Sequence, residues 1–153
     1  MRRLLIIAGL LASACSGMRP AAPIQVAESC TMDDTAVQIE AGVSDEVTVP
    51  LTCEGLARML SAYRAAYEER FGRQGLADRV VRIRRGPYLD DSGHTGYTYA
   101  DAIDLTLVGL VGFPHELNHV RTGSGHAGWC VDFEPWSEAV LGVDQRAYLG
   151  CGK

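Results

Sequence analysis

The most constraining feature of this chain is the run His115-Glu116-Leu117-Asn118-His119, which His126 follows closely. In a helix, positions i and i+4 lie on the same face, so the imidazoles of His115 and His119 can converge on one metal ion. Glu116 stands beside the first histidine, where its carboxylate can take a proton from a metal-activated water. The chain has four histidines, and three of them fall in this stretch. The pattern predicts a zinc site on a helix, with Glu116 as the general base of a hydrolysis.

The residues around the motif set the expected limits of this helix. Pro114 precedes the first histidine and suits the first turn of a helix, where its missing N–H would have no partner. Gly123 and Gly125 are expected to end the helix and to let the backbone turn sharply. Such a turn would bring His126 back toward the metal. A last helix is expected from Glu134 to about Tyr148.

The N-terminus has the pattern of a bacterial export signal. The chain begins Met1-Arg2-Arg3, is almost purely apolar over residues 4–12, and continues Ala12-Ser13-Ala14-Cys15. An apolar run of this length is typical of a signal peptide at 1–14 and is too short to span a membrane. The last four residues resemble a lipobox, although Ala12 stands where leucine is usual. We favour a lipid on Cys15, because a free thiol there would be exposed in an oxidising compartment.

Ordinary signal peptidase cleavage, which would give a soluble secreted protein, is the alternative. With lipidation, residues 15–27 form a lipid-anchored tether that contains Pro20 and Pro23. The protein is then exported and held on the periplasmic or extracellular face of a bacterial membrane. Residues 28–153 make up one domain, which is long enough to bury its own core.

The remaining cysteines form an even set in an exported domain: Cys30, Cys53, Cys130 and Cys151. Two disulfides are therefore expected, with three connectivities open to them. Cys130 and Cys151 bracket the last helical stretch, so we favour a bond between them, which leaves Cys30 with Cys53. No pair has the C-x-x-C spacing, and a cysteine zinc site is the weaker interpretation.

Charge limits the range of partners. Removal of the leader takes away Arg2 and Arg3, so the 14 basic residues fall to 12 against 19 acidic ones, a net charge of −7. An acidic surface of this size argues against nucleic acid and against electrostatic adhesion to anionic lipid. The lipid on Cys15 is the one membrane contact that the sequence implies.

Hydrophobic periodicity predicts the other elements. Apolar residues recur at helical spacing from Cys53 to Phe71, which indicates an amphipathic helix that packs on a sheet. Two alternating runs, around Val37 and Val47, suggest a hairpin. Between Arg79 and Arg85, apolar and basic residues alternate, which predicts a strand with one solvated face.

Two further strands are expected directly before the motif helix, at 96–99 and 103–107. An exposed edge here could receive an extended peptide by strand addition. The hydroxyl of Tyr97 or Tyr99 could support an oxyanion, but an ordinary place in the strand is favoured for both. His94, alone in the preceding loop, is expected to be a surface histidine.

With these features the sequence resembles the zincin metallopeptidases. The resemblance is specific over His115 to Trp129 and architectural over Cys53 to Leu107. It implies an α+β fold in which a small mixed sheet packs on an N-terminal backing helix and on the active-site helix, with a C-terminal helix following. It also implies zinc-dependent cleavage of a peptide or protein substrate.

Two zincin patterns compete for the third ligand. Gly125-His126-Ala127-Gly128-Trp129 is similar to the element of SprT-like and related short-loop zincins, whereas Glu138 is similar to the ligand of thermolysin-like gluzincins. We favour His126, because a neutral imidazole is a ready zinc ligand and the glycines explain the turn. Glu134 and Glu138 then become candidates for hydrogen bonds to the ligand imidazoles.

The rival class is a lipid-anchored zinc-binding or structural protein without catalysis. Two disulfides reduce the need for a structural metal in a chain of this size. The intact Glu116 also counts against this class, because a purely structural site does not need that carboxylate.

Overall fold

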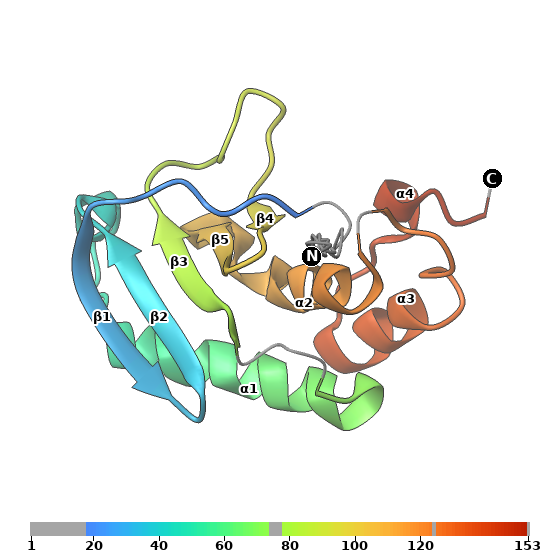
Figure 1. The fold of residues 1–153 in the computed structure, drawn as a ribbon. Coiled ribbons are helices and arrows are strands. Elements are labelled where there is room, and N and C mark those ends of the chain that lie inside the picture. The colour runs from blue at the N-terminus through green and yellow to red at the C-terminus, as the bar shows by residue number, and fades with distance from the viewer. Residues whose placement is uncertain (1–17, 74–77, 124, 153) are drawn as a thin grey trace, which may run out of the picture.

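The computed structural model describes residues 18–73, 78–123 and 125–152, so the predicted signal peptide and Cys15 lie outside the described residues. Within these ranges the chain forms an α+β fold around a mixed sheet with the strand order β1-β2-β3-β5-β4 (Figure 1). The strands are β1 Val26–Met32, β2 Thr35–Glu40, β3 Val80–Arg84, β4 Gly96–Thr98 and β5 Ala102–Thr106. Strands β2, β3 and β5 run parallel, whereas β1 and β4 are antiparallel edge strands. The α+β class with a mixed sheet agrees with the prediction.

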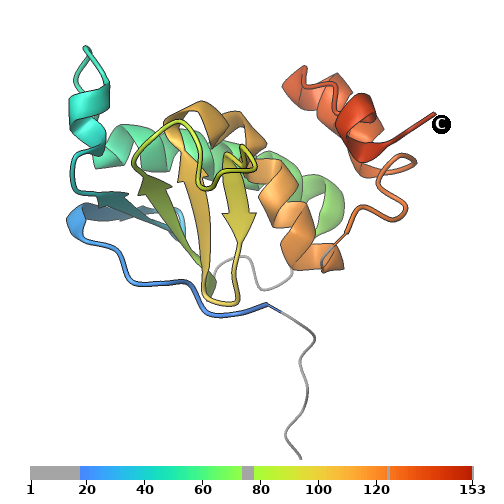
Figure 2. The ribbon, with the colours of Figure 1, turned by 90° about the horizontal axis from the view of Figure 1, so that it is seen from above.

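The helices lie against one face of this sheet and beyond one of its edges. The α-helices are α1 Cys53–Phe71, α2 Phe113–Thr122, α3 Phe133–Trp136 and α4 Arg146–Leu149. Shorter helical turns are η1 Val43–Glu46, η3 Leu107–Gly112 and the π-helical η4 Ser137–Leu141. Helix α1 crosses the sheet, α2 packs on α1 beside the edge strand β4, and α3 and α4 lie beyond α2 (Figure 2).

Helix α1 has the limits that its periodicity predicts. Thr52 caps its first turn by accepting the backbone N–H of Gly55 at 3.1 Å, and the helix ends before Gly72, whose φ is +83°. Leu56, Leu60 and Tyr67 are buried on the face toward the sheet and α2. Across the parallel strands, apolar residues pair in register to form the other side of this core. These pairs are Val37 with Val81, Ile39 with Ile83, and Ile83 with Leu105.

The opposite face of the sheet is covered as well, which makes the predicted solvated face of β3 wrong. Arg82 is 5% exposed and Asp104 on β5 only 1%. The guanidinium of Arg82 donates to both carboxylate oxygens of Asp104, with Nη2 at 2.8 Å from Oδ2, and also to the carbonyl of Ala22 at 2.5 Å. Residues 18–25, assigned to the tether from the sequence, run along this face. The backbone N–H of Ala100 donates to the carbonyl of Arg19 at 3.1 Å.

The hairpin predicted between the runs around Val37 and Val47 is also wrong. Strand β2 pairs with the preceding β1 through a turn at Asp33 and Asp34, both at positive φ, whereas residues 43–46 form the short helix η1. Strand β1 already begins at Val26, two residues before the expected start of the domain. In the described part of the chain, no helix has the length and apolar character needed to cross a membrane.

Both expected disulfides are present. Cys30–Cys53 ties β1 to the start of α1, and Cys130–Cys151 ties the segment before α3 to the residues after α4. The favoured connectivity is confirmed.

The buried ion pair predicts an unequal response to two substitutions. Asp104→Ala leaves Arg82 buried without its carboxylate and should lower the free energy of unfolding by about 3–5 kcal/mol. Arg73→Ala removes an exposed guanidinium that contacts Asp34 and Glu68, and should leave the free energy of unfolding nearly unchanged, because exposed ion pairs contribute little. Urea unfolding of both variants measures the difference, and equal losses would contradict the role given to the Arg82–Asp104 pair.

Candidate metal centre

Helix α2 presents the motif as the sequence predicts. Gly112 precedes its first turn, Pro114 lies within that turn, and Gly123 ends the helix while donating its N–H to the carbonyl of His119. The hydroxyl of Tyr67 on α1 donates to the buried Oδ1 of Asn118 at 2.7 Å and fixes α2 on its backing helix.

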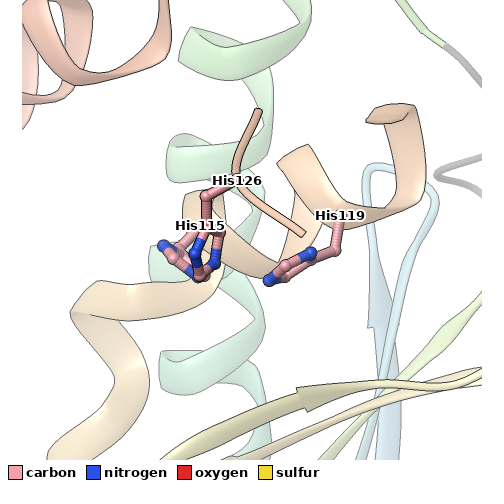
Figure 3. A group of neighbouring side chains, drawn as sticks. All are labelled: His115, His119 and His126. Atoms are coloured by element: carbon pink, nitrogen blue, oxygen red, sulfur yellow. The ribbon is translucent and has the colours of Figure 1, made fainter. Parts of the chain in front are cut away.

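The loop after α2 returns His126 to the helix. Gly123 has φ +83° and Gly125 +99°, values that a residue with a side chain rarely adopts. Nitrogen atoms from His115, His119 and His126, one from each ring, all lie within 4.8 Å of one another. Figure 3 shows the three side chains meeting, two from α2 and His126 from the loop. This cluster could bind a metal ion.

Trp129 forms the support of the cluster. The centroid of its ring lies 4.8 Å from those of His115 and His119 and 4.7 Å from that of His126. The indole is buried, and its Nε1 donates to the hydroxyl of Thr122 at the end of α2, at 3.1 Å. Packing against one rigid aromatic surface therefore holds the three imidazoles at a common position.

The hydrogen bonds of the histidines leave one nitrogen of each bonded ring for a metal. His115 Nδ1 lies 2.7 Å from Gln145 Oε1, and His119 Nδ1 lies 3.1 Å from the carbonyl of Gly123. Since both partners are acceptors, both Nδ1 atoms carry the proton and both Nε2 atoms keep a free lone pair. Gln145 is held in turn, because its Nε2 donates to Ser137 Oγ at 3.3 Å.

Burial and an orphaned nitrogen support metal binding. Burial lowers the pKa of each of the three histidines, to about 4 for His115. The rings are thus neutral near pH 7, as metal ligation requires. In the described part of the chain, the buried Nε2 of His126 has no hydrogen-bond partner. A metal ion would satisfy this atom, whose burial is otherwise a cost.

Glu116 lies beside the cluster in a confined space. It is 6% exposed, and Thr98 Oγ1 on β4 donates to its Oε2 at 2.7 Å. Burial raises the pKa of Glu116 to about 7, against the smaller lowering effects of Thr98 and His94. A carboxyl group in this range can both accept and release a proton near neutral pH. Gly96 on β4 provides the room, since a Cβ there would stand 2.6 Å from Glu116 Oε1.

The cluster opens onto a cleft with two lobes, of about 580 and 280 Å³. Both lobes are lined by His94, Gly96, His115, Glu116 and Tyr148. The larger lobe extends along the edge strand β4 and past Arg19 of the N-terminal segment. The smaller one extends toward apolar side chains, namely Val108, Val111 and Val143. The cluster and Glu116 therefore face a space large enough for a substrate segment on either side.

The C-terminal residues, which form one wall of the cleft, do not make the single helix expected from Glu134 to about Tyr148. Helix α3 continues into η4 and stops at Gly142, whose φ is +68°, and α4 begins only at Arg146. Because of this break, Gln145 reaches His115 and Tyr148 lies over the cluster. The ring centroid of Tyr148 lies 5.5 Å from that of His115 and 5.4 Å from that of His126. Neither Gln145 nor Tyr148 belongs to a motif, so neither was predicted as a site residue from the sequence.

Glu134 and Glu138 do not take the positions expected from the sequence. Both carboxylates contact the guanidinium of Arg146, and Glu134 Oε2 lies 3.3 Å from its Nε. The carbonyl of Gly123 and the amide of Gln145 accept the hydrogen bonds that were expected to go to these glutamates. Glu138 stands outside the described cluster of histidines.

No family model matches this chain, and neither the curated proteins nor the solved structures include a significant match.

Three substitutions should lower the affinity for a metal ion by different amounts. His126→Ala removes a candidate ligand and should weaken the binding of a divalent transition metal by more than about 100-fold, that is, by more than the loss of a hydrogen bond to a ligand. Gln145→Ala removes only a hydrogen bond to His115 and should cost about 10–100-fold. Glu138→Ala disturbs an exposed contact with Arg146 and should stay within about threefold. Competition with a chromophoric chelator measures all three, and a larger loss for Glu138→Ala than for His126→Ala would reverse the assignment of the third ligand.

The contact between Gly96 and Glu116 predicts a coupling between two substitutions. Gly96→Ala should lower the free energy of unfolding by about 1–3 kcal/mol, because the added methyl group displaces the carboxylate. In a Glu116→Ala background most of this loss should vanish, since the clashing atoms are gone. A double-mutant cycle by urea unfolding measures the coupling, and strictly additive losses would show that the two positions do not interact.

Proposed function

We propose that this protein is a zinc-dependent hydrolase of peptide bonds in the bacterial cell envelope. The observation that carries the proposal is the meeting of three neutral imidazoles and one buried carboxylate, Glu116, in a single cleft. A site that served stability alone would need the imidazoles but not a carboxylate with a pKa near 7.

Zinc is the metal that this donor set favours. Three imidazoles from a rigid support match the three protein ligands of catalytic zinc sites and leave a fourth position open to water. Hard cations such as Mg²⁺ and Ca²⁺ prefer oxygen ligands, and the described cluster offers only nitrogen. Zinc would lower the pKa of its water to about 7 and polarise the carbonyl group to be attacked.

The chain's own residues would move the proton. Glu116 takes a proton from the attacking water, and the water oxygen forms a bond to the carbonyl carbon of the substrate. The same carboxyl group then delivers the proton to the nitrogen of the leaving amine as the C–N bond breaks. Thr98 holds the carboxylate through its hydrogen bond to Oε2, and the other oxygen lies under Gly96.

An extended peptide fits the form of the cleft. Strand β4 is an edge of the sheet and lines the larger lobe through Gly96, Tyr97 and Thr98. A substrate strand could add to this edge through backbone hydrogen bonds, which would hold the chain next to Glu116. The smaller lobe, with Val108, Val111 and Val143, is suited to an apolar side chain.

The location in the cell envelope rests on the sequence and on the disulfides. Cys30–Cys53 and Cys130–Cys151 are the kind of bonds that persist in an oxidising compartment. The apolar leader and Cys15 would supply export and a lipid anchor.

Glu116→Gln should separate metal binding from catalysis. The amide keeps the size of the side chain but cannot accept a proton, so hydrolysis should fall by about 10²–10⁴-fold. Metal content by elemental analysis should stay at one zinc per chain. The assay follows cleavage of a mixed peptide pool by mass spectrometry, with zinc removed by a chelator and then restored.

Two results would count against the proposal. Wild-type protein that is loaded with zinc and cleaves nothing would favour the rival, a lipid-anchored protein whose metal is structural. Unchanged turnover in Glu116→Gln would place the base elsewhere. Thr98→Val is a matched control, because it removes the hydrogen bond to Glu116 but leaves the carboxylate. Its rate of hydrolysis should fall less than that of Glu116→Gln.

A further inference from the structure

The N-terminal segment, residues 18–25, is held against the sheet by hydrogen bonds at the turn between β4 and β5. The backbone N–H of Ala100 donates to the carbonyl of Arg19 at 3.1 Å, and the backbone N–H of Ala21 donates to Asp101 Oδ1 at 2.9 Å. In Figure 2 the segment, drawn in blue, passes along the sheet from β1 toward β4. The backbone of Arg19 is thus fixed at one end of the edge strand.

Arg19 lines the larger lobe of the cleft. Among the described residues that line either lobe, it is the only arginine or lysine. Burial raises the pKa of Tyr99, and the positive charge of Arg19 opposes this shift, which agrees with a guanidinium near the end of β4. Because a guanidinium stays protonated in proteins, the cleft has one permanent positive charge from a side chain.

This charge is not neutralised within the described part of the chain. Asp101 accepts from the backbone of the N-terminal segment, and Asp104 pairs with Arg82 and Arg84. Arg19 forms no ion pair with either carboxylate or with any other described residue. The guanidinium is therefore available to an anionic group of a ligand in the cleft.

Arg19 stands a short distance along β4 from Glu116. Thr98 at the end of β4 donates to Glu116 Oε2 at 2.7 Å, and Ala100, which bonds to Arg19, follows two residues later. Two residues of a strand span about 7 Å. A peptide added to β4 with its cleaved bond beside Glu116 would therefore bring a residue about two to four positions away to the guanidinium.

We propose that Arg19 is a specificity-determining residue, which binds a carboxylate of the substrate about two to four residues from the cleaved bond. This inference rests on the proposed function and adds a substrate class, namely peptides with a carboxylate at this distance. The carboxylate belongs to an acidic side chain or to the C-terminus of a short peptide, and both offer the same two oxygens. A guanidinium can donate to both oxygens at once, which makes the contact directional.

The rest of the cleft favours this placement of the carboxylate. Glu116 would repel a second carboxylate placed directly beside it, so the substrate's acidic group is better held at a distance. The smaller lobe has apolar side chains, namely Val108, Val111 and Val143, and no described arginine or lysine. The acidic part of the substrate therefore belongs in the larger lobe with Arg19.

The kinetic test uses pairs of peptides that the zinc-loaded protein cleaves at one bond and that differ only by glutamate or glutamine at one position. At one position about two to four residues from this bond, wild type should cleave the glutamate peptide with a kcat/KM about 10–100-fold higher. In Arg19→Ala this ratio should fall to about one, because no charge remains to distinguish the two side chains. Arg19→Glu should favour lysine over glutamine at the same position.

Arg58→Ala is the matched control. Arg58 is exposed on α1 and lines neither lobe of the cleft, so the ratio between glutamate and glutamine peptides should equal that of the wild type. The preference should also shrink at high salt, because the contact joins two charges at a site that solvent reaches.

The source of the carboxylate is decided by peptides that end at the same position, as the free acid and as the amide. A preference for the free acid alone assigns the contact to a C-terminus. A preference for glutamate alone assigns it to an acidic side chain. Either result supports the role of Arg19.

A binding measurement supplies a readout that does not depend on turnover. The probes are short peptides with a hydroxamate at one end, to bind the metal, and glutamate or glutamine at the second, third or fourth residue from it. One series carries the hydroxamate at its C-terminus and the other at its N-terminus, which covers both directions along β4. Calorimetry should find one glutamate probe bound about 10–100-fold more tightly than its glutamine counterpart, and only in proteins that keep Arg19. Acetohydroxamate, which has no carboxylate, should bind wild type and Arg19→Ala within about threefold of one another.

The outcomes separate the two proposals. Wild-type protein that cleaves peptides without any preference for a carboxylate would overturn the role of Arg19 and leave the proposed function standing, as would a preference that persists in Arg19→Ala. If the wild type hydrolyses nothing, the proposed function fails, and the hydroxamate series still decides the contact with Arg19. Equal affinity for every pair of glutamate and glutamine probes, or no binding of any hydroxamate, would also overturn the inference.

Discussion

The centre depends on one packing interaction, that of Trp129 with the three imidazoles. The indole is fully buried under them and bonded to Thr122 at the end of α2. Exposing or removing a buried tryptophan costs about 3–5 kcal/mol, so any other path for the loop after α2 is disfavoured. The turn allowed by Gly123 and Gly125 is thereby made the preferred one, and His126 is held at α2 before any ligand is bound.

The same burial acts on both kinds of group in the site. Trp129 packs at an angle on Phe133, and Phe133 contacts Trp136, which contacts Tyr67 beside Phe71 on α1, so these rings form one aromatic core. Because the cluster and Glu116 lie at the surface of this core, loss of solvation keeps the imidazoles uncharged and makes the carboxyl harder to ionise. Burial therefore explains both the lowered pKa of the imidazoles and the raised pKa of Glu116. This burial also costs stability. Among the described residues, some buried polar atoms have no hydrogen-bond partner, including Asn118 Nδ2 and Glu134 Oε1.

Local rules were enough for part of the fold and of the site. The limits of α1, the start and end of α2 and the pairing of the cysteines follow from periodicity, capping residues and spacing, which act over a few residues. Arg82 was misjudged because its burial depends on residues 18–25, which return across the sheet from a distant part of the sequence. Gln145 was missed because a left-handed residue at Gly142 breaks the last helix, and no periodic pattern marks such a break. The covering of the sheet by residues 18–25 and the helix break at Gly142 were therefore the two features that the sequence did not predict.

The bond between Cys130 and Cys151 bears on how this molecule would survive proteolysis. It joins two cysteines that are 21 positions apart and encloses Gln145 and Tyr148, whose side chains line the cleft. A cut by a protease anywhere inside that loop would leave the severed piece covalently attached through sulfur. The nicked protein would still run as one molecule under non-reducing conditions. The segment that carries Gln145 and Tyr148 would stay tethered close to His115. Only reduction of the disulfide would release the fragment, so a cut in this segment stays hidden until Cys130–Cys151 is reduced.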